Sequence, residues 1–437
     1  MKKVVKFGGS SLADAGQFRK AAEIIRADEM RVFVVPSAPG KRFDSDTKVT
    51  DLLYQCYELA VKGEEFHVPF SLIKDRYSEI ISGLGLSLSL SDSFDEIESR
   101  LKDSPEKDYT ASRGEYLNGK ILASFLGFDF IDPAPYIKFA DDGLFESEIT
   151  DSLLYNELKK HEHAVIPGFY GSMPNGTIKT FSRGGSDITG SIVARAVLAS
   201  VYQNWTDVDG FLMADPRIID NPKTISTITY KELRELSYMG AGVLHEESIF
   251  PVRTAGIPIV IKNTNRPEAE GTLIVSDVNA PETSNVITGI AGKKGFSVIS
   301  IEKAMMNTET GFGRRVLEAI EKEDVNFEHL PSGIDTMSVV LSTDEISEKR
   351  DRILDRICST VEPDTISIED GLALIAVVGR GMVKAKGTAL RVFKATADAD
   401  VNIKMIDQGS SELNIIIGVD ESDFVSAMNA IYREFEK

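Results

Sequence analysis

V-V-K-F-G-G-S-S, at residues 4–11, indicates the fold of the first part of the chain. A short apolar strand runs into a glycine-rich turn, a helical pattern follows at residues 15–26, and a second apolar strand follows at residues 31–35. This order is typical of βαβ units, in which helices cover a parallel sheet. The same alternation returns at residues 164–167, 188–198, 199–205 and 257–262. We therefore expect an α/β fold with a mostly parallel sheet sandwiched by helices in this part of the chain.

The same stretch places a lysine beside two glycines, a combination suited to phosphate. Lys6 would lie at the end of the strand, where its ammonium can neutralise phosphoryl oxygens, and the amides of Gly8 and Gly9 can line the same pocket. The chain has no G-x-x-x-x-G-K-[ST] string, and G-G-S-S is not a dinucleotide fingerprint, so neither of those loops is predicted. The alternative is that Lys6 is an edge-strand residue whose ammonium reaches solvent.

A second glycine-rich stretch, T-F-S-R-G-G-S-D at residues 180–187, precedes an apolar helix expected at residues 188–198. Amides at glycines and at a helix N-terminus favour a bound carboxylate or phosphate. Ser186 or Asp187 can cap the helix, and Arg183 can bind a carboxylate through two parallel hydrogen bonds. The alternative is a turn that caps an ordinary helix beside a solvated arginine.

Composition excludes several classes of partner. The 437 residues exceed one ordinary core, so two or three domains are expected. The formal net charge of −19 argues against nucleic acid and anionic membranes. Cys56 and Cys358 lie far apart and predict neither a disulfide framework nor a thiolate metal site. No signal-peptide pattern occurs, and no apolar run approaches the roughly 20 residues of a membrane span, so we expect a cytoplasmic protein.

The last third of the chain contains a weak internal repeat after a turn-rich linker at residues 276–285. Each copy predicts the order of elements of a βαββαβ module. The first copy comprises residues 298–304, 312–322, 325–330, 337–341 and 346–361. The second comprises residues 372–378, 389–397, 401–406, 413–419 and 424–435. No strand follows the second copy, so residues 285–290 are a candidate for its missing strand. Residues 54–101 show helical periodicity and much charge, which predicts a helical insertion.

Four motifs follow one another in a fixed order. They are V-K-F-G-G-S-S at residues 5–11, S-R-G-E at 112–115, S-R-G-G-S-D at 182–187, and W-T-D-V-D-G-F with D-P-R between 205 and 217. Together they resemble the motifs of the aspartate kinases (aspartokinases), and the C-terminal repeat resembles the paired ACT modules of the monofunctional, lysine-responsive members. The resemblance implies an amino-acid-kinase domain at residues 1–285 and ferredoxin-like ACT modules at residues 286–368 and 369–437.

The resemblance also implies a reaction. The γ-phosphoryl group of ATP would pass to the side-chain carboxylate of L-aspartate and give 4-phospho-L-aspartate, the first step of lysine, threonine and methionine biosynthesis. Mg²⁺ would bridge the phosphates, and a carboxylate needs no general base because it is already a nucleophile. The implied catalytic residues are Lys6, Gly8, Gly9 and Asp187. The implied nucleotide-binding residues are Lys6, Gly9, Ser10, Thr206, Asp207 and Arg217, and no metal ligand is assigned.

Aspartate recognition needs a cation for the α-carboxylate and an anion for the ammonium, and the resemblance gives these roles to Arg183 and Glu115. The other implied substrate-binding residues are Ser37, Thr50, Phe169, Gly184 and Ser186. Glu115 is expected at the start of a helix over residues 116–125, where the alternative is a carboxylate that interacts with the helix dipole. The helical insertion would shape the amino-acid pocket.

Two departures from the family pattern concern the nucleotide. Leu212 stands where a tyrosine is usual, and Gly242 stands where a lysine is usual. They motivate the alternative that a decayed kinase acts as an amino-acid sensor, which the retention of Lys6 argues against. Glutamate kinase, carbamate kinase and uridylate kinase resemble the same fold, but they would not explain all four motifs together with paired ACT modules.

For regulation, the resemblance implies an effector bound between ACT modules of two chains. Lysine is the first choice, and threonine, alone or with lysine, is the alternative. The matching residues are Met306, Glu309, Asn326, Glu328 and Ser332. Glu328 could pair with the effector's ammonium, and its alternative is an exposed acid at a strand end. Pairing of ACT modules across chains predicts a homodimer, and a further association into tetramers stays open.

Overall fold

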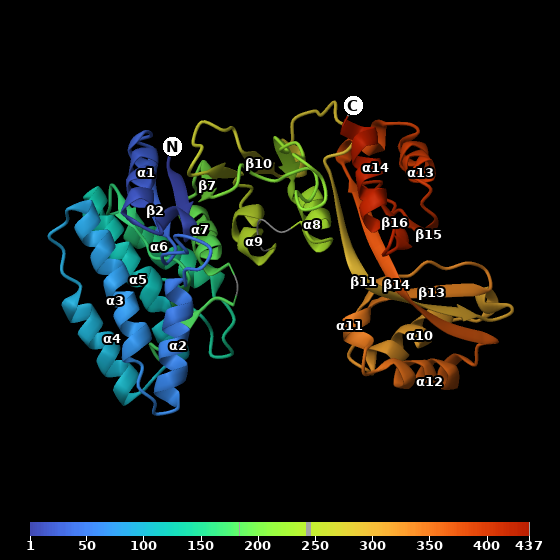
Figure 1. Cartoon of the computed structure of the whole chain (residues 1–437), viewed down its shortest axis with the longest axis horizontal. Coiled ribbons are helices and arrows are strands. Elements are labelled where there is room, and N and C mark those ends of the chain that lie inside the picture. The colour runs from blue at the N-terminus through green and yellow to red at the C-terminus, as the bar shows by residue number, and fades with distance from the viewer. Residues whose placement is uncertain (183, 242–245, 437) are drawn as a thin grey trace. The chain divides into compact units, whose positions relative to one another are not determined.

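The computed structural model describes residues 1–182, 184–241 and 246–436, and it divides the chain into two compact units (Figure 1). The first, called here the catalytic unit, comprises Met1–Phe211, Thr224–Tyr230 and Gly242–Ala280. The second, called the regulatory unit, comprises Leu212–Lys223, Lys231–Ala241 and Pro281–Lys437. Among the described residues, no helix is long and apolar enough to cross a membrane.

An eight-stranded, mostly parallel sheet forms the centre of the catalytic unit. Its order is β3-β4-β2-β1-β7-β9-β10-β8, and only the β9–β10 pair is antiparallel. The strands are β1 (Lys3–Phe7), β2 (Arg31–Pro36), β3 (Asp129–Phe130), β4 (Ala164–Val165), β7 (Val201–Thr206), β8 (Thr227–Thr229), β9 (Ile259–Asn263) and β10 (Thr272–Val275). A separate antiparallel hairpin consists of β5 (Tyr170–Ser172) and β6 (Ile178–Thr180). The expected mostly parallel α/β sheet is confirmed.

β1 occupies an interior position in this sheet, which fixes where a site can form. Its apolar residues are fully buried, and it pairs in parallel with β2 on one side and β7 on the other. In this register Phe7 lies opposite both Pro36 and Trp205. The chain segments that leave these three strands therefore emerge together at the carboxyl ends of the strands. Parallel sheets bind ligands at these ends.

Helices cover the sheet, and four of them pack side by side as a bundle (Figure 1). The bundle consists of α2 (Val49–Val61), α3 (His67–Leu84), α4 (Ser91–Asp103) and α5 (Lys107–Leu126), which confirms the helical pattern expected at residues 54–101. Aromatic side chains such as Phe70, Tyr77 and Phe94 are buried within it. The remaining helices are α1 (Ala15–Arg26), α6 (Ser147–Leu158), α7 (Gly185–Ala196) and α9 (Glu246–Thr254), with a short 3₁₀ helix η1 at Ser10–Leu12.

The regulatory unit is built on a six-stranded antiparallel sheet of order β12-β13-β11-β14-β16-β15. Its strands are β11 (Gly289–Glu302), β12 (Phe327–His329), β13 (Thr336–Ser342), β14 (Thr365–Val378), β15 (Ile403–Asp407) and β16 (Asn414–Asp420). Its helices are α8 (Tyr230–Tyr238), whose first residue belongs to the catalytic unit, α10 (Phe312–Glu321), α11 (Thr343–Ile346), α12 (Arg350–Val361), α13 (Thr388–Asp398) and α14 (Phe424–Glu436). Short 3₁₀ helices lie at Met306–Thr308 and Arg380–Lys384, and another at Asp277–Asn279 belongs to the catalytic unit.

Two long strands, β11 and β14, run through both repeats of this unit. The second half of β11 pairs with β13, as the first repeat requires. The first half of β11, from Gly289 to Lys293, pairs with residues 374–378 of β14, which in turn pair with β16 of the second repeat. The second repeat therefore obtains its fourth strand from residues that precede the first repeat. The strand lies slightly later in the sequence than the candidate at residues 285–290.

A buried ion pair fixes α8 within the regulatory unit. Glu232 is fully buried, and its Oε2 lies 2.7 Å from Nη1 of Arg380. The hydroxyl of Thr288 donates to the other oxygen of Glu232 at 2.5 Å, and the amide side chain of Asn414 donates to Glu235 at 2.6 Å. These contacts connect α8 to the segment before β11, to the 3₁₀ helix at Arg380–Lys384 and to β16.

Candidate active site

Lys6 lies near the carboxyl end of β1, where buried polar groups contact its side chain. Its side chain is largely buried, and its Nζ lies 2.6 Å from Oδ1 of Asp187 and 3.3 Å from Oδ1 of Asn204. The amide side chain of Asn204 also donates to Asp187 at 2.8 Å. Lys6 is on β1, Asn204 on β7 and Asp187 in the first turn of α7, so three elements hold the ammonium in place. The alternative of a solvent-seeking edge-strand lysine is therefore wrong.

The glycine turn after β1 packs against a neighbouring backbone segment. The amide of Gly40 donates to the carbonyl of Gly9 at 2.9 Å, and a Cβ on Gly9 would lie 2.9 Å from the carbonyl oxygen of Ala38. The amide of Gly8 donates to the carbonyl of Trp205 at 2.9 Å, which extends the β1–β7 pairing by one residue. The expectation that the Gly8 amide lines the pocket is therefore wrong in this structure, because the neighbouring strand already uses it.

Glu115 lies in the middle of α5, which begins at Lys107, and not at a helix start. The alternative of a carboxylate at the helix dipole is wrong for that reason. Its Oε1 accepts from the amide of Ala38 at 3.1 Å, whereas its Oε2 is buried with no hydrogen-bond partner among the described residues. Burial raises the pKa of Glu115 to about 7, although the hydrogen bond from Ala38 opposes the rise.

The start of α7 differs from the expected cap. Gly184 is the N-cap residue with φ of 58°, and no side chain caps the helix, so Ser186 and Asp187 lie inside its first turn. Phe169 has φ of 83°, and a Cβ on Gly185 would lie only 2.3 Å from its ring. The absent side chain at Gly185 therefore allows the Phe169 ring to pack against the helix start.

Two cavities at this edge contain most of the residues that the sequence singled out. The first, of about 200 Å³, is lined by Lys6, Ser37, Thr50, Glu115, Phe169, Gly184, Gly185, Ser186 and Asp187. The second, of about 580 Å³, shares Ser37, Thr50 and Glu115 with it and adds Gly9, Ser10, Asp207 and residues 38–44 with Lys48. A small cavity with a lysine and a buried acid thus adjoins a larger one that is open to the glycine turn.

Comparison with known proteins agrees with this geometry. Residues 1–263 match the amino acid kinase family, and residues 375–435 match an ACT domain. Aspartokinase 3 of Bacillus subtilis is 41% identical to the chain, and the alignment covers 99% of the chain and 98% of the relative. The chain belongs to the aspartate kinase family.

Solved structures support the assignment. The crystal structure of Clostridium acetobutylicum aspartate kinase superimposes with a TM-score of 0.91 and 51% identity, and each chain is fully covered. Escherichia coli aspartokinase III, in complex with aspartate and ADP, gives a TM-score of 0.76 at 23% identity with both chains fully covered, which shows the shared fold. The same protein in complex with lysine and aspartate gives a TM-score of 0.73.

Some of the expected site residues of this aspartate kinase line neither cavity or are not described. Arg183 and Gly242 lie outside the described residues. The hydroxyl of Thr206 donates to Asp207 at 3.2 Å, and Thr206 lines neither cavity. Arg217 belongs to the regulatory unit, where it is exposed and pairs with Asp215 at 2.6 Å. Leu212 is half-buried in the same unit.

Sequence reasoning missed several residues of the site. Asn204 lies two residues before Thr206 on β7, directly opposite Lys6 in the β1–β7 register, and a polar residue within an apolar strand was the available signal. Arg76 of α3 is almost fully buried, donates to the carbonyl of Gly40 at 2.9 Å, and pairs with Asp46 at 2.6 Å. Its guanidinium therefore fixes the loop that lines the larger cavity. No local pattern connects Arg76 to that loop, because 30 residues separate it from Asp46.

The residues expected at the effector site are spread over two segments of the regulatory unit. Met306 is buried in a 3₁₀ helix, and Glu309 follows it and pairs with Lys303 at 2.8 Å and with Arg315. The second segment contains Asn326, Glu328 and Ser332. Glu328 is on β12 and accepts a hydrogen bond from the hydroxyl of Tyr238 at 2.5 Å, so it is not a free acid at a strand end.

Proposed function

We propose that this aspartate kinase transfers the γ-phosphoryl group of ATP to the β-carboxylate of L-aspartate, giving 4-phospho-L-aspartate and ADP. A carboxylate oxygen forms a bond to the γ-phosphorus, and the bond from that phosphorus to the β–γ bridging oxygen breaks. The observation that carries the proposal is the small cavity in which the Lys6 ammonium and the unpartnered Oε2 of Glu115 both lie. The Lys6 ammonium, which Asp187 holds, and the Glu115 carboxylate line one open cavity, and this pair of charges matches a phosphoryl group beside the ammonium of an amino acid.

Each charged group then has a separate task. The Lys6 ammonium stabilises negative charge on the transferring phosphoryl group, and Asp187 and Asn204 hold the ammonium in position. Glu115 accepts the ammonium of aspartate through Oε2, and that positive charge would lower its pKa and keep it ionised. Arg183 stays the predicted partner of the α-carboxylate.

Magnesium fits this arrangement without a dedicated protein cage. Among the described residues, no group of three or more His, Cys, Asp or Glu could hold a metal ion. Mg²⁺ keeps several waters and commonly uses one or two carboxylates plus substrate phosphates. The carboxylate of Asp207 in the larger cavity is the candidate for that contribution, because Asp187 already pairs with the Lys6 ammonium. The ion would supply charge neutralisation between the phosphates.

For regulation, we propose lysine as the effector, with threonine as the alternative, bound where ACT modules of two chains meet in a homodimer. Support for an amino-acid ligand comes from charged groups of the regulatory unit, namely Glu328 on the edge strand β12 and Glu309 after the 3₁₀ helix at Met306–Thr308. Lysine is bound in the E. coli aspartokinase III structure described above. Domain limits at residues 285 and 368, a cytoplasmic location and a tetramer stay predictions.

The test is aspartate-dependent formation of an acyl phosphate from Mg-ATP, trapped as its hydroxamate, with and without millimolar lysine. We expect product in the absence of lysine and less product in its presence. Product that lysine does not reduce would keep the kinase and redirect the effector search to threonine. No product from a folded wild-type chain, together with amino-acid binding, would instead support the decayed-kinase sensor.

A further inference from the structure

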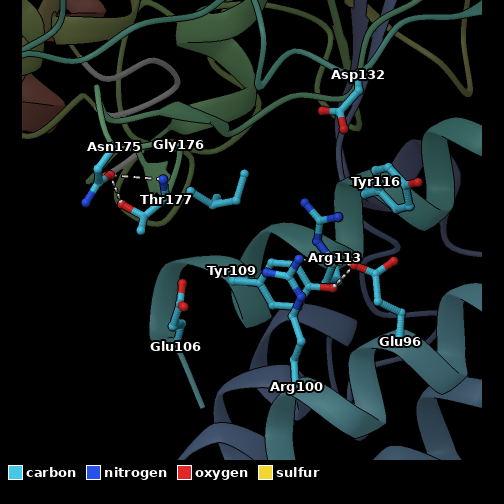
Figure 2. A pocket seen from close by; sticks show the side chains of 11 residues that line it. Glu96, Arg100, Glu106, Tyr109, Arg113, Tyr116, Asp132, Asn175, Gly176 and Thr177 are labelled. Atoms are coloured by element: carbon cyan, nitrogen blue, oxygen red, sulfur yellow. Dashed lines mark hydrogen bonds and ion pairs between the residues drawn. The ribbon is translucent and has the colours of Figure 1, made fainter. Parts of the chain in front are cut away.

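A third cavity of about 350 Å³ lies in the catalytic unit, away from the residues assigned above (Figure 2). It is lined by residues of α4 and α5, by Asp132 after β3, and by the turn of the β5–β6 hairpin. The lining residues are Glu96, Arg100, Glu106, Tyr109, Arg113, Tyr116, Asp132, Asn175, Gly176, Thr177 and Ile178. None of them lines either cavity of the active site. Its volume lies in the range of small-molecule sites.

The feature that singles out this cavity is a buried arginine that forms no ion pair among the described residues, although its charge acts on Glu115 across α5. Only 6% of Arg113 is exposed, and it forms no ion pair with any carboxylate among the described residues. Its Nε and Nη2 donate to the hydroxyl of the adjacent Ser112 at 3.1 and 2.9 Å, which leaves Nη1 without a hydrogen bond there. A buried guanidinium normally has a carboxylate or phosphate partner, because desolvation of an unpaired charge is costly.

Aromatic rings hold the guanidinium in the cavity. Its central carbon lies 4.6 Å from the ring centre of Tyr109, 4.4 Å from that of Tyr116 and 5.2 Å from that of Tyr170. Figure 2 shows the guanidinium between Tyr109 and Tyr116, directed toward the space below Asp132. Cation–π contacts stabilise the charge and fix its plane, but they do not use its N–H donors.

Helix geometry separates this cavity from the active site. Tyr109, Arg113 and Tyr116 recur at spacings of four and three residues, so they form one stripe along α5. Glu115 lies two residues from Arg113, which places it on a different face of the helix, where it contacts the amide of Ala38. The two sides of α5 therefore present different charged groups to different cavities.

The other charges indicate what kind of ligand fits. Asp132 accepts hydrogen bonds at Oδ1 from the amide of Ala134 and from the hydroxyl of Tyr170, and its Oδ2 has no partner among the described residues. Glu96 pairs with Arg100 at 3.4 Å, so the charges of these two largely cancel. What remains is the Arg113 cation at the base and carboxylates at the rim. A polyanion such as phosphate would face repulsion from that rim, whereas a zwitterion complements both charges.

We propose that this cavity binds a small zwitterion of the α-amino-acid class, whose carboxylate accepts from Arg113 and whose ammonium contacts Asp132. The tyrosine rings provide apolar contact for a short side chain. The site is distinct from the aspartate cavity and from the ACT modules, and it does not rest on the proposed function.

Hydrogen exchange measured on the full chain locates binding at this site. L-alanine and propionate are the matched probes, because propionate has the same carbon skeleton and carboxylate but no ammonium. We expect L-alanine to slow amide exchange in peptides covering residues 107–116 and 172–178, with a midpoint at least tenfold lower than that of propionate. Inorganic phosphate should give no protection there. Equal midpoints for alanine and propionate, or protection by phosphate, would overturn the zwitterion assignment.

Two variants separate the two charges. Arg113→Met keeps the length of the side chain and should abolish protection by both carboxylates. Asp132→Asn keeps its hydrogen bond from Ala134 and should weaken L-alanine at least tenfold while leaving propionate unchanged. If Arg113→Met fails to fold, the Asp132→Asn comparison still decides the matter. Unchanged alanine midpoints in that variant would refute the proposed contact with Asp132.

Discussion

Replacing Glu115 by glutamine measures what the burial of this carboxyl costs the fold. Its pKa is raised to about 7 from an ordinary value of 4.5, so the folded state favours the protonated form. The stabilisation is fully present below pH 4.5 and is lost as the pH rises through about 7, where the buried group ionises. At 1.36 kcal/mol per pH unit, this corresponds to about 3 kcal/mol of unfolding free energy between pH 4 and pH 8.

Glu115→Gln removes this pH dependence and keeps an oxygen that can accept from the amide of Ala38. We expect the unfolding free energy of the variant relative to wild type to increase by about 2–3 kcal/mol when the pH is raised from 5 to 8. Urea titrations followed by fluorescence give this quantity for the catalytic unit, because the only tryptophan, Trp205, is buried there. Exposed Glu148→Gln is the matched control and should show the same relative stability at both pH values.

The same variant connects stability to the proposed reaction. If Glu115 binds the ammonium of aspartate, Glu115→Gln should raise the KM for aspartate at least tenfold while it stabilises the unit at pH 8. A relative stability that is equal at pH 5 and pH 8 would refute the reasoning about burial. An unchanged KM with the expected pH dependence would leave the burial intact and refute only the contact with aspartate.

Three further variants test other parts of the structure. Lys6→Met should lower kcat at least ~100-fold and destabilise the catalytic unit, because it leaves Asp187 without its cation. Adding Asp187→Asn should restore the stability but not kcat. Full activity in either variant would contradict the assignment. Gly185→Ala would place a Cβ 2.3 Å from the ring of Phe169 and so displace the ring. Steady-state kinetics should then show a KM for aspartate raised about tenfold. An unchanged KM would mean that the ring moves without consequence. Glu232→Gln should lower the unfolding free energy of the regulatory unit by about 2–3 kcal/mol, because it breaks a buried ion pair. Urea titrations followed by circular dichroism measure this change, and the transition followed by tryptophan fluorescence should stay the same. An unchanged transition of the regulatory unit would show that the ion pair contributes nothing.

Much of the fold followed from local patterns. The run from residue 4 to residue 35 contains strand, glycine turn, helix and strand, and the structure has these elements as β1, η1, α1 and β2. The repeat in the last third predicted most strands of the antiparallel sheet within a few residues, but β11 and β14 begin well before the strands predicted at residues 298 and 372. A strand repeats its side-chain direction every two residues and a helix about every 3.6 residues. These repeats involve only near neighbours, so the sequence displays them directly.

The candidate site was only partly visible in the sequence. Glycines, lysine and acids in short motifs marked Lys6, Glu115 and Asp187, and the structure brings all three to one cavity. The sequence did not show whether a backbone amide is free to bind a ligand. The amide of Gly8, for example, donates to a carbonyl on a neighbouring strand. Arg76 was missed for a related reason, since its partners lie on a loop 30 residues away.

The sequence by itself therefore determined the order of the elements, the kinds of charged group available, and the resemblance to the aspartate kinases. Only the tertiary structure decided that Lys6 is held by Asp187 and Asn204, that Glu115 has an unusually high pKa, and that one strand completes the second repeat from before the first. Only the tertiary structure, too, shows that Arg113 is buried and forms no ion pair among the described residues. The physical reason is that hydrogen bonding, desolvation and charge pairing depend on which distant segments lie within a few ångströms, and no local pattern encodes those distances.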